Sequence, residues 1–157
     1  MDSPVDRFWT SYLQSLPQAA SDKKHYYEAF HFGNDERLAN VCADLVMRGV
    51  KTATSSLLWE YEAKGKAPPR VGDLSIVTNW SSEPLCIIET VELRIVPFNG
   101  VDERFVYDYG EGDRSMNWWH KDMWDYYSVE CASLGRAPTP GMPVVCERFR
   151  VVFPENR

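Results

Sequence analysis

The stretch Arg48-Gly49-Val50-Lys51-Thr52-Ala53-Thr54 marks the point at which a helix gives way to a strand. A glycine directly after a periodic apolar run is typical of a helix end, and the Thr/Ala run that follows favours a strand. The same stretch places a lysine three residues before a threonine. Because a desolvated lysine can lose its proton and act as a base toward a hydroxyl, Lys51 and Thr54 are candidates for a base and a nucleophile. The alternative is a solvated lysine beside a strand, since no glycine-rich lead-in makes this stretch a phosphate-binding loop.

Regular elements are predicted on both sides of this stretch. Upstream, Asn34 is expected to cap a helix that ends at Gly49 and buries Leu38, Val41, Cys42, Leu45 and Val46. Downstream, residues 52–58 suit a strand and residues 59–64 suit a helical turn. Further strands are predicted at residues 26–32, 74–80, 85–96 and 144–153, and further helices at residues 3–16 and 115–134. The turn 81–84 would join two of these strands as a hairpin.

These elements predict an α+β fold built on a small, closed or nearly closed β-barrel of about five or six strands with flanking helices. The length of 157 residues suits a single domain, and a hydrophobic fraction of 44% suits a packed core. We therefore expect one domain over residues 1–157, in which residues 1–25 form an N-terminal helical extension.

Composition and charge exclude several classes of function. A net charge of −6 argues against binding to duplex DNA, although a nucleoside or a single RNA strand remains open. The four cysteines form no C-x-x-C pair and the three histidines show no ligand spacing, so we expect neither a metal nor a cofactor. The N-terminus is acidic and no apolar run approaches the ~20 residues of a membrane span, which predicts a cytoplasmic protein without a membrane partner.

A second candidate for chemistry is Glu111, which lies between two glycines in the loop Tyr109-Gly110-Glu111-Gly112-Asp113. Flanking glycines leave the backbone free to adopt unusual dihedrals and let other groups approach the carboxylate closely. The alternative is a loop whose acids only face solvent. Lys51 and Thr54 would project to opposite faces of a regular strand, so their cooperation requires a turn or a bulge at the strand's start.

Aromatic residues are concentrated in the predicted helix 115–134. Trp119, Met123, Tyr126 and Tyr127 share one stripe of that helix, which predicts that they pack in the core. Trp118 falls outside the stripe. We expect it to be partly exposed, where its ring could stack on a nucleobase.

Taken together, these residues resemble the ASCH-domain family of the PUA-like superfamily, over residues 32–153. The resemblance rests on Gly49-Val50-Lys51-Thr52-Ala53-Thr54, which is similar to the family's G-x-K-x-x-[TE] motif, and on Val71-Gly72-Asp73, the acidic loop 111–115, and Glu147 with Phe149 in the final strand. It implies a β-barrel related to the PUA RNA-binding fold. The chain looks most like a longer subgroup whose acidic loop reads E-G-E-G-D, with Tyr109 here at the first glutamate.

The resemblance also implies an activity, because some small ASCH proteins are amidohydrolases that remove the acetyl group from N4-acetylcytidine. By that resemblance Lys51, Thr54 and Glu111 are the catalytic residues. Thr54 would attack the amide carbonyl, and Lys51 would carry its proton to the leaving amine while Glu111 orients the lysine. If the lysine stays charged beside Glu111, then Glu111 is the base and Lys51 stabilises the oxyanion.

Four further residues are candidates for substrate binding. Arg48 lies beside the catalytic lysine, and Ser56 stands where the small acetylcytidine hydrolases carry an arginine. Arg114 could replace that arginine, and Trp118 could stack on the base. A histidine is common in the related helix about where Met123 falls here.

The sequence therefore predicts a cofactor-independent hydrolase acting on an N4-acylated cytidine-type nucleoside. One alternative is an RNA-binding module, with or without ribonuclease activity, that holds a single strand through Lys51, Arg114 and Trp118. Another is a regulator that binds a modified nucleoside without chemistry. The sequence leaves open the acyl group, the choice between free nucleoside and RNA, and the choice of Lys51 or Glu111 as the base.

Overall fold

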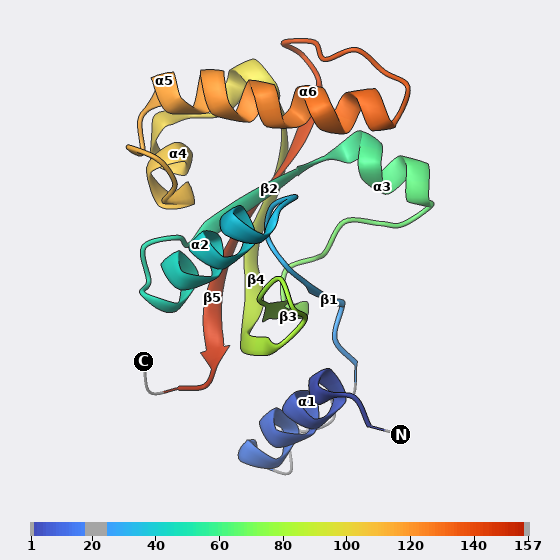
Figure 1. Cartoon of the computed structure of the whole chain (residues 1–157), viewed down its shortest axis with the longest axis vertical. Helices are drawn as coiled ribbons and strands as arrows, with labels where there is room; N and C mark the ends of the chain where they lie inside the picture. Colours follow the sequence, from blue (N-terminus) through green and yellow to red (C-terminus); the bar gives the residue numbers. More distant parts are fainter. Residues whose placement is uncertain (1, 18–24, 156–157) are drawn as a thin grey trace.

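The computed structural model describes residues 2–17 and 25–155, and Figure 1 shows their arrangement. The elements are α1 (Pro4–Ser15), β1 (Glu28–Phe30), α2 (Glu36–Met47), β2 (Ala53–Leu57), α3 (Leu58–Lys64), β3 (Leu74–Thr78), β4 (Pro84–Pro97), η2 (Phe98–Gly100), α4 (Glu103–Tyr109), α5 (Met116–Trp118), η3 (Trp119–Met123), α6 (Trp124–Ser133) and β5 (Pro143–Phe153). The predicted α+β class is confirmed.

Within the described ranges, five strands form one sheet in the order β1-β3-β4-β5-β2. β1 pairs with β3 in parallel and the other pairs are antiparallel, so the predicted hairpin of β3 and β4 is confirmed. Register shifts lie between Ile87 and Ile88 and between Thr90 and Glu92, where β4 pairs with β5. Such irregularities bend a strand, and the sheet curls into a half barrel of the PUA-like type with β1 and β2 at its edges.

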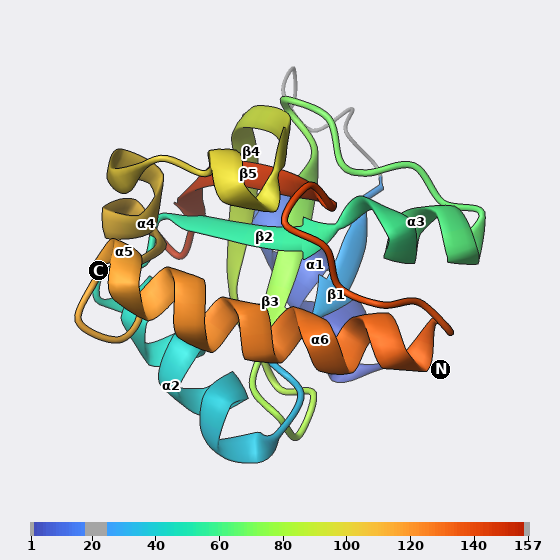
Figure 2. The same cartoon turned by 90° about the horizontal axis from the view of Figure 1, so that it is seen from above.

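Helices cover the curled sheet on different sides. In Figure 1, α6 lies across one end of the sheet and α1 lies at the other, and in the view of Figure 2 α6 runs between β2 and α2. The helices α1 and α2 each pack on a cluster of buried side chains of their own, whereas α4, η3 and α6 share a third cluster. Every residue of β3 is buried, because one face of this strand meets α1 and the other meets α2.

The N-terminal helix forms as its sequence predicts. Ser3 accepts a hydrogen bond from the amide of Asp6, whose carboxylate accepts one from the amide of Ser3, and Pro4 occupies the first turn. Trp9 and Tyr12 are its buried residues and pack on the sheet. The predicted extension over residues 1–25 includes residues 1 and 18–24, which lie outside the described residues.

Helix α2 departs from the prediction in its cap and its buried face. Asp35, rather than Asn34, is the N-cap, and its side chain accepts a hydrogen bond from the amide of Leu38 at 2.8 Å. The buried residues are Ala39, Cys42, Ala43 and Val46, whereas Val41 is 42% exposed. A spacing of 3.6 residues per turn turns Val41 about 100° away from Cys42, so only one narrow stripe faces the core.

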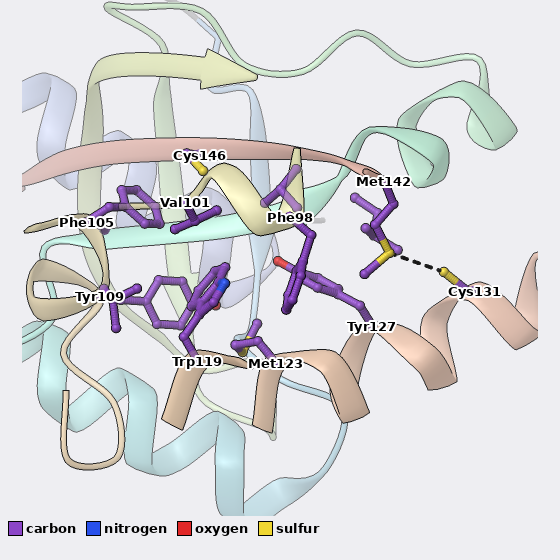
Figure 3. Close-up of a cluster of buried hydrophobic side chains, with 14 residues drawn as sticks. Phe98, Val101, Phe105, Tyr109, Trp119, Met123, Tyr127, Cys131, Met142 and Cys146 are labelled. Carbon is purple, nitrogen blue, oxygen red and sulfur yellow. Dashed lines mark hydrogen bonds between the residues drawn. The ribbon is translucent and has the colours of Figure 1, made fainter. Parts of the chain in front are cut away.

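The helix predicted over residues 115–134 is confirmed, with a π-helical turn at Trp119–Met123. Figure 3 shows Trp119, Met123 and Tyr127 pointing into a cluster of buried side chains. The predicted core role of these three residues is confirmed, while Tyr126 is only half-buried. Trp118 is half-buried as well, which confirms the prediction of partial exposure.

Candidate functional site

A tight turn after α2 directs Lys51 into the interior. The amides of Val50 and Lys51 both donate to the carbonyl of Leu45, at 2.9 and 3.1 Å, and Gly49 adopts a positive φ of 76°. This geometry folds the chain back over the helix end before β2 begins at Ala53. The turn that we expected between Lys51 and the regular part of the strand is therefore present. The Lys51 side chain is 0% exposed, so the alternative of a solvated lysine is wrong.

Groups of Glu111 and Tyr109 lie closest to the ammonium of Lys51, with the Phe32 ring centroid farther away at 5.5 Å. Its Nζ lies 2.7 Å from Glu111 Oε2 and donates to the Tyr109 carbonyl at 3.1 Å. It also lies 3.4 Å from the centroid of the Tyr109 ring. A carboxylate, a carbonyl and an aromatic face are all partners of a cation. This arrangement fits a charged lysine that holds Glu111 in place.

The loop that carries Glu111 packs directly on this turn. Gly110 has a φ of 79°, and a Cβ there would lie 2.6 Å from the Val50 carbonyl oxygen and 2.8 Å from the Cα of Lys51. A side chain at this position would therefore push the two segments apart. The glycine allows the close approach that joins Glu111 to Lys51.

Glu111 and Thr54 line one pocket of about 340 Å³, counting its open mouth, between α2, β2 and α6. The other lining residues are Phe32, Gly33, Leu38, Cys42, Ser55, Tyr109, Met123 and Tyr126. Burial and the charge of Glu111 raise the pKa of the Cys42 thiol to about 12, so this cysteine is neutral in the pocket wall. Met123 also lines the pocket and supplies no titratable group.

The three candidate catalytic residues therefore lie together but in two layers. Glu111, whose side chain is 12% exposed, faces the pocket, and Lys51 lies behind it. Among the described residues, no hydrogen bond joins the Thr54 hydroxyl to Lys51 or Glu111. Any proton transfer between Thr54 and Glu111 runs across the pocket that both residues line.

Sequence reasoning missed a group of hydroxyls at the wall of the same pocket, two of whose members, Ser55 and Tyr109, line it. Ser55 donates a hydrogen bond to the Tyr109 hydroxyl at 3.2 Å and also bonds to the Tyr127 hydroxyl. Its two neighbours on the same face of β2, Ala53 and Leu57, are 0% exposed. A serine at alternating spacing between two apolar residues is the signal that could have revealed this group.

The structure separates two of the predicted substrate-binding residues from this pocket. Arg48 is exposed and forms an ion pair with Asp44 at 3.2 Å. Ser56 lines a different hollow, beside Glu28 and Glu60. Of the residues that the structure describes, those lining the Thr54 pocket do not include Arg48 or Ser56. Their roles in substrate binding stay predictions.

The other two predicted substrate-binding residues lie near Glu111. Trp118 lines an outer hollow that is next to the Thr54 pocket. Glu111 and Leu38 line both the hollow and the pocket. Arg114 donates to the Tyr107 carbonyl at 2.8 Å and lies against the Tyr107 ring. Trp118 is therefore placed to contact a ligand that extends outward from the pocket.

Glu147 is one of the residues of the final strand on which the family resemblance rests. It lies directly across from Thr54 in the pairing of β2 with β5. It accepts a hydrogen bond from Thr90 at 2.6 Å. Burial, together with the charges of Glu28 and Asp73, raises the pKa of its carboxyl to about 7 against the opposing effect of the Thr90 hydrogen bond.

We expect Glu147 to make stability depend on pH. Its folded-state pKa of about 7 lies above the ordinary value of 4.5, so the folded state binds more protons between these limits and stability falls as pH rises through them. Wild type should therefore lose about 3 kcal/mol of unfolding free energy through this carboxyl as the pH rises past 7, and Glu147→Gln should remove that loss. Urea unfolding of both proteins at pH 4.5, 6 and 8 measures the difference, and equal pH dependence in the two proteins would contradict this role.

In residues 2–17 and 25–155, no group of three or more His, Cys, Asp or Glu side chains is arranged to hold a metal ion. None of the helices in these ranges has the length and apolar character needed to cross a membrane.

Comparisons with known proteins agree on one family. The sequence model of the ASCH domain family matches residues 28–153 of this chain. The structure of an ASCH domain from Lactobacillus crispatus JV V101 is similar, with 40% identity and a TM-score of 0.90 over 96% of this chain and 95% of that chain. Protein EF3133 from Enterococcus faecalis V583 gives 29% identity and a TM-score of 0.86 over 95% and 88% of the two chains. No curated protein matches this chain. The family match spans both the Lys51 turn and the Glu111 loop, and the chain belongs to the ASCH domain family.

Proposed function

We propose that this ASCH domain is an amidohydrolase that removes the acyl group from an N4-acylated cytidine-type nucleoside, with N4-acetylcytidine giving cytidine and acetate. The observation that carries the proposal is the buried ion pair of Lys51 and Glu111, 2.7 Å apart, behind a pocket that Glu111 and Thr54 both line. A buried charge pair is costly to desolvate, and such pairs are often kept for function at a cleft. The PUA-like fold of ASCH domains is associated with RNA binding and with hydrolase activity, so a modified nucleoside is a fitting substrate class.

In this proposal Glu111 is the base and Lys51 stays charged. The Lys51 ammonium donates to the Glu111 carboxylate and to the Tyr109 carbonyl. A lysine that donates to two acceptors in this way is not placed to accept a proton from Thr54. The Thr54 oxygen attacks the acyl carbonyl carbon as its proton passes to Glu111. The protonated Glu111 then gives that proton to the cytosine N4 as the C–N bond breaks, which releases cytidine and leaves an acyl ester on Thr54.

The second half of the reaction regenerates the enzyme. Glu111 accepts a proton from a water molecule, whose oxygen attacks the ester carbon, and the C–O bond to Thr54 then breaks. The proton returns to the Thr54 oxygen and acetate leaves. Throughout both steps the charge of Lys51 favours the ionised carboxylate and the negative charge that develops on the carbonyl oxygen.

The surroundings of the site favour a nucleoside over an RNA strand. The hollow that contains Ser56 balances Glu28 and Glu60 with Lys64 and Lys66, and the outer hollow sets Arg37 beside Glu111 and Asp122. Neither hollow is a basic groove of the kind that follows a phosphate backbone, and the net charge of −6 acts against phosphate binding. Trp118 and the half-buried Tyr126 offer ring faces for a base without requiring phosphates.

The test is direct conversion of N4-acetylcytidine by the purified full chain. We expect stoichiometric release of cytidine and acetate without added metal or cofactor, followed by chromatography with absorbance detection. An RNA oligomer containing the same modified base, supplied in parallel, should react much more slowly than the free nucleoside. Absence of product from both substrates at high enzyme concentration would refute the proposed activity, while preferential deacylation of the RNA would refute the choice of substrate.

A further inference from the structure

Three hydroxyl groups meet at the wall of the Thr54 pocket. They belong to Ser55 on β2, Tyr109 at the end of α4 and Tyr127 on α6. Figure 3 shows the rings of Tyr109 and Tyr127 entering the same buried cluster from different elements. Ser55 and Tyr109 line the pocket itself, so the group connects the core to the candidate site.

The directions of these hydrogen bonds follow from the number of protons. A serine hydroxyl has one proton, and Ser55 donates it to the Tyr109 oxygen at 3.2 Å. The bond between Ser55 and Tyr127 is therefore donated by the Tyr127 hydroxyl. Tyr127 gives to Ser55 and Ser55 gives to Tyr109, which leaves the proton of Tyr109 unused. Among the described residues, this proton has no acceptor within hydrogen-bond distance.

The Tyr109 hydroxyl is a neutral donor in a fixed position. Burial, together with the negative charge of Glu111, raises the pKa of Tyr109 well above its ordinary value, so the phenol keeps its proton at physiological pH. Its ring is held by the Lys51 ammonium, 3.4 Å from the ring centroid, and by the Trp119 ring, with centroids 5.2 Å apart. A donor fixed in a site from which water is excluded needs no reorientation when a negative charge develops nearby.

We infer that the Tyr109 hydroxyl is a catalytic residue that donates a hydrogen bond to the acyl carbonyl oxygen of the substrate. This inference rests on the proposed amide hydrolysis. As the Thr54 oxygen bonds to the carbonyl carbon, the electron pair of the C=O bond moves to its oxygen, and the O–H of Tyr109 stabilises that charge without transferring its proton. The pocket brings together the nucleophile, the base and this donor, as Thr54, Glu111 and Tyr109 all line it.

Ser55 and Tyr127 act through Tyr109 as positioning residues. The hydrogen bond from Ser55 occupies a lone pair of the phenol oxygen, which turns the remaining O–H away from Ser55. Tyr127 fixes Ser55 in turn and is 1% exposed. Through these two hydrogen bonds, the buried Tyr127 sets the orientation of the Tyr109 hydroxyl at the pocket.

The test compares Tyr109→Phe with wild type in steady-state hydrolysis of N4-acetylcytidine. This change keeps the ring that packs on Lys51 and Trp119 and removes only the hydroxyl. We expect kcat to fall by about a hundredfold to a thousandfold, the usual effect of losing one oxyanion donor, with KM changed by less than about threefold. Tyr12→Phe is the matched control, because Tyr12 is also buried but lies on α1, where it packs on the sheet outside the pocket, and its kcat should match wild type.

The outcomes separate this inference from the proposed activity. An active wild type with full kcat in Tyr109→Phe overturns the role of Tyr109 and leaves the amidohydrolase proposal standing. An inactive wild type overturns both. If Tyr109→Phe does not fold, Ser55→Ala decides the matter, since loss of the positioning bond should lower kcat by about tenfold without raising KM, and an unchanged kcat would overturn the inference.

Discussion

Replacing Thr54 with alanine is expected to lower kcat for N4-acetylcytidine by about a thousandfold or more, because the change removes the proposed nucleophile. Thr54 lies on an edge strand of the half barrel and is only half-buried, so its truncation leaves a small space at the pocket wall. The fold should survive the substitution. Initial rates of cytidine release, with urea unfolding of the same preparation, measure both effects.

Two further variants make this result specific. Thr54→Ser retains a hydroxyl and should keep a measurable rate well above that of Thr54→Ala. Thr52→Ala is the matched control, since Thr52 is exposed and lies outside the pocket, with its hydroxyl 3.3 Å from the Asp108 carbonyl. Its kcat should equal that of wild type. If Thr54→Ala turned over at the wild-type rate, water activated by Glu111 would have to replace Thr54 as the nucleophile.

Replacing Lys51 with methionine is expected to cost about 3–5 kcal/mol of stability and to abolish turnover. The substitution keeps most of the side chain's volume but leaves Glu111 as a buried carboxylate without its cation at 2.7 Å. Desolvation of an unpaired charge is the reason for the large cost. Urea unfolding at pH 7 measures the loss of stability, and the nucleoside assay measures the loss of activity.

A matched control comes from an exposed ion pair in the same chain. Lys66 lies 3.0 Å from Glu28, with 39% and 35% of the two side chains exposed, so Lys66→Met should cost less than about 1 kcal/mol. The double variant Lys51→Met with Glu111→Gln should recover much of the stability but none of the activity, because it removes the unpaired charge along with the base. Equal costs for Lys51→Met and Lys66→Met would show that the buried pair has no special role in folding.

Local sequence rules predicted most of the regular elements. The capping box at Ser3 and Asp6, the glycine at position 49 and the 81–84 turn each act within a few residues, so the pattern alone located α1, the end of α2 and the β3–β4 hairpin. The errors arose where neighbouring residues compete for one role. Asn34 and Asp35 can both cap a helix, and in the structure the cap is Asp35.

The candidate site shows the same division. Sequence reasoning selected Lys51, Thr54 and Glu111 because their residue types and order match a motif. The spacing could not show that Lys51 lies behind Glu111 rather than beside Thr54, since that depends on a close approach at Gly110. It also could not reveal Ser55, Tyr109 and Tyr127 as one group, because they come from three elements that meet only in the fold.

Patterns in the amino-acid sequence were enough to predict the α+β class, the positions of the main helices and strands, and a lysine, a threonine and a glutamate as candidates for chemistry. These features depend on short-range periodicity, capping and motif order, which are properties of neighbouring residues. The folded structure was needed to show that Lys51 is buried and paired with Glu111, and that the Tyr109 hydroxyl has a proton without an acceptor among the described residues. Burial and pairing arise between residues far apart in the chain, and only the folded arrangement brings them within reach of one another.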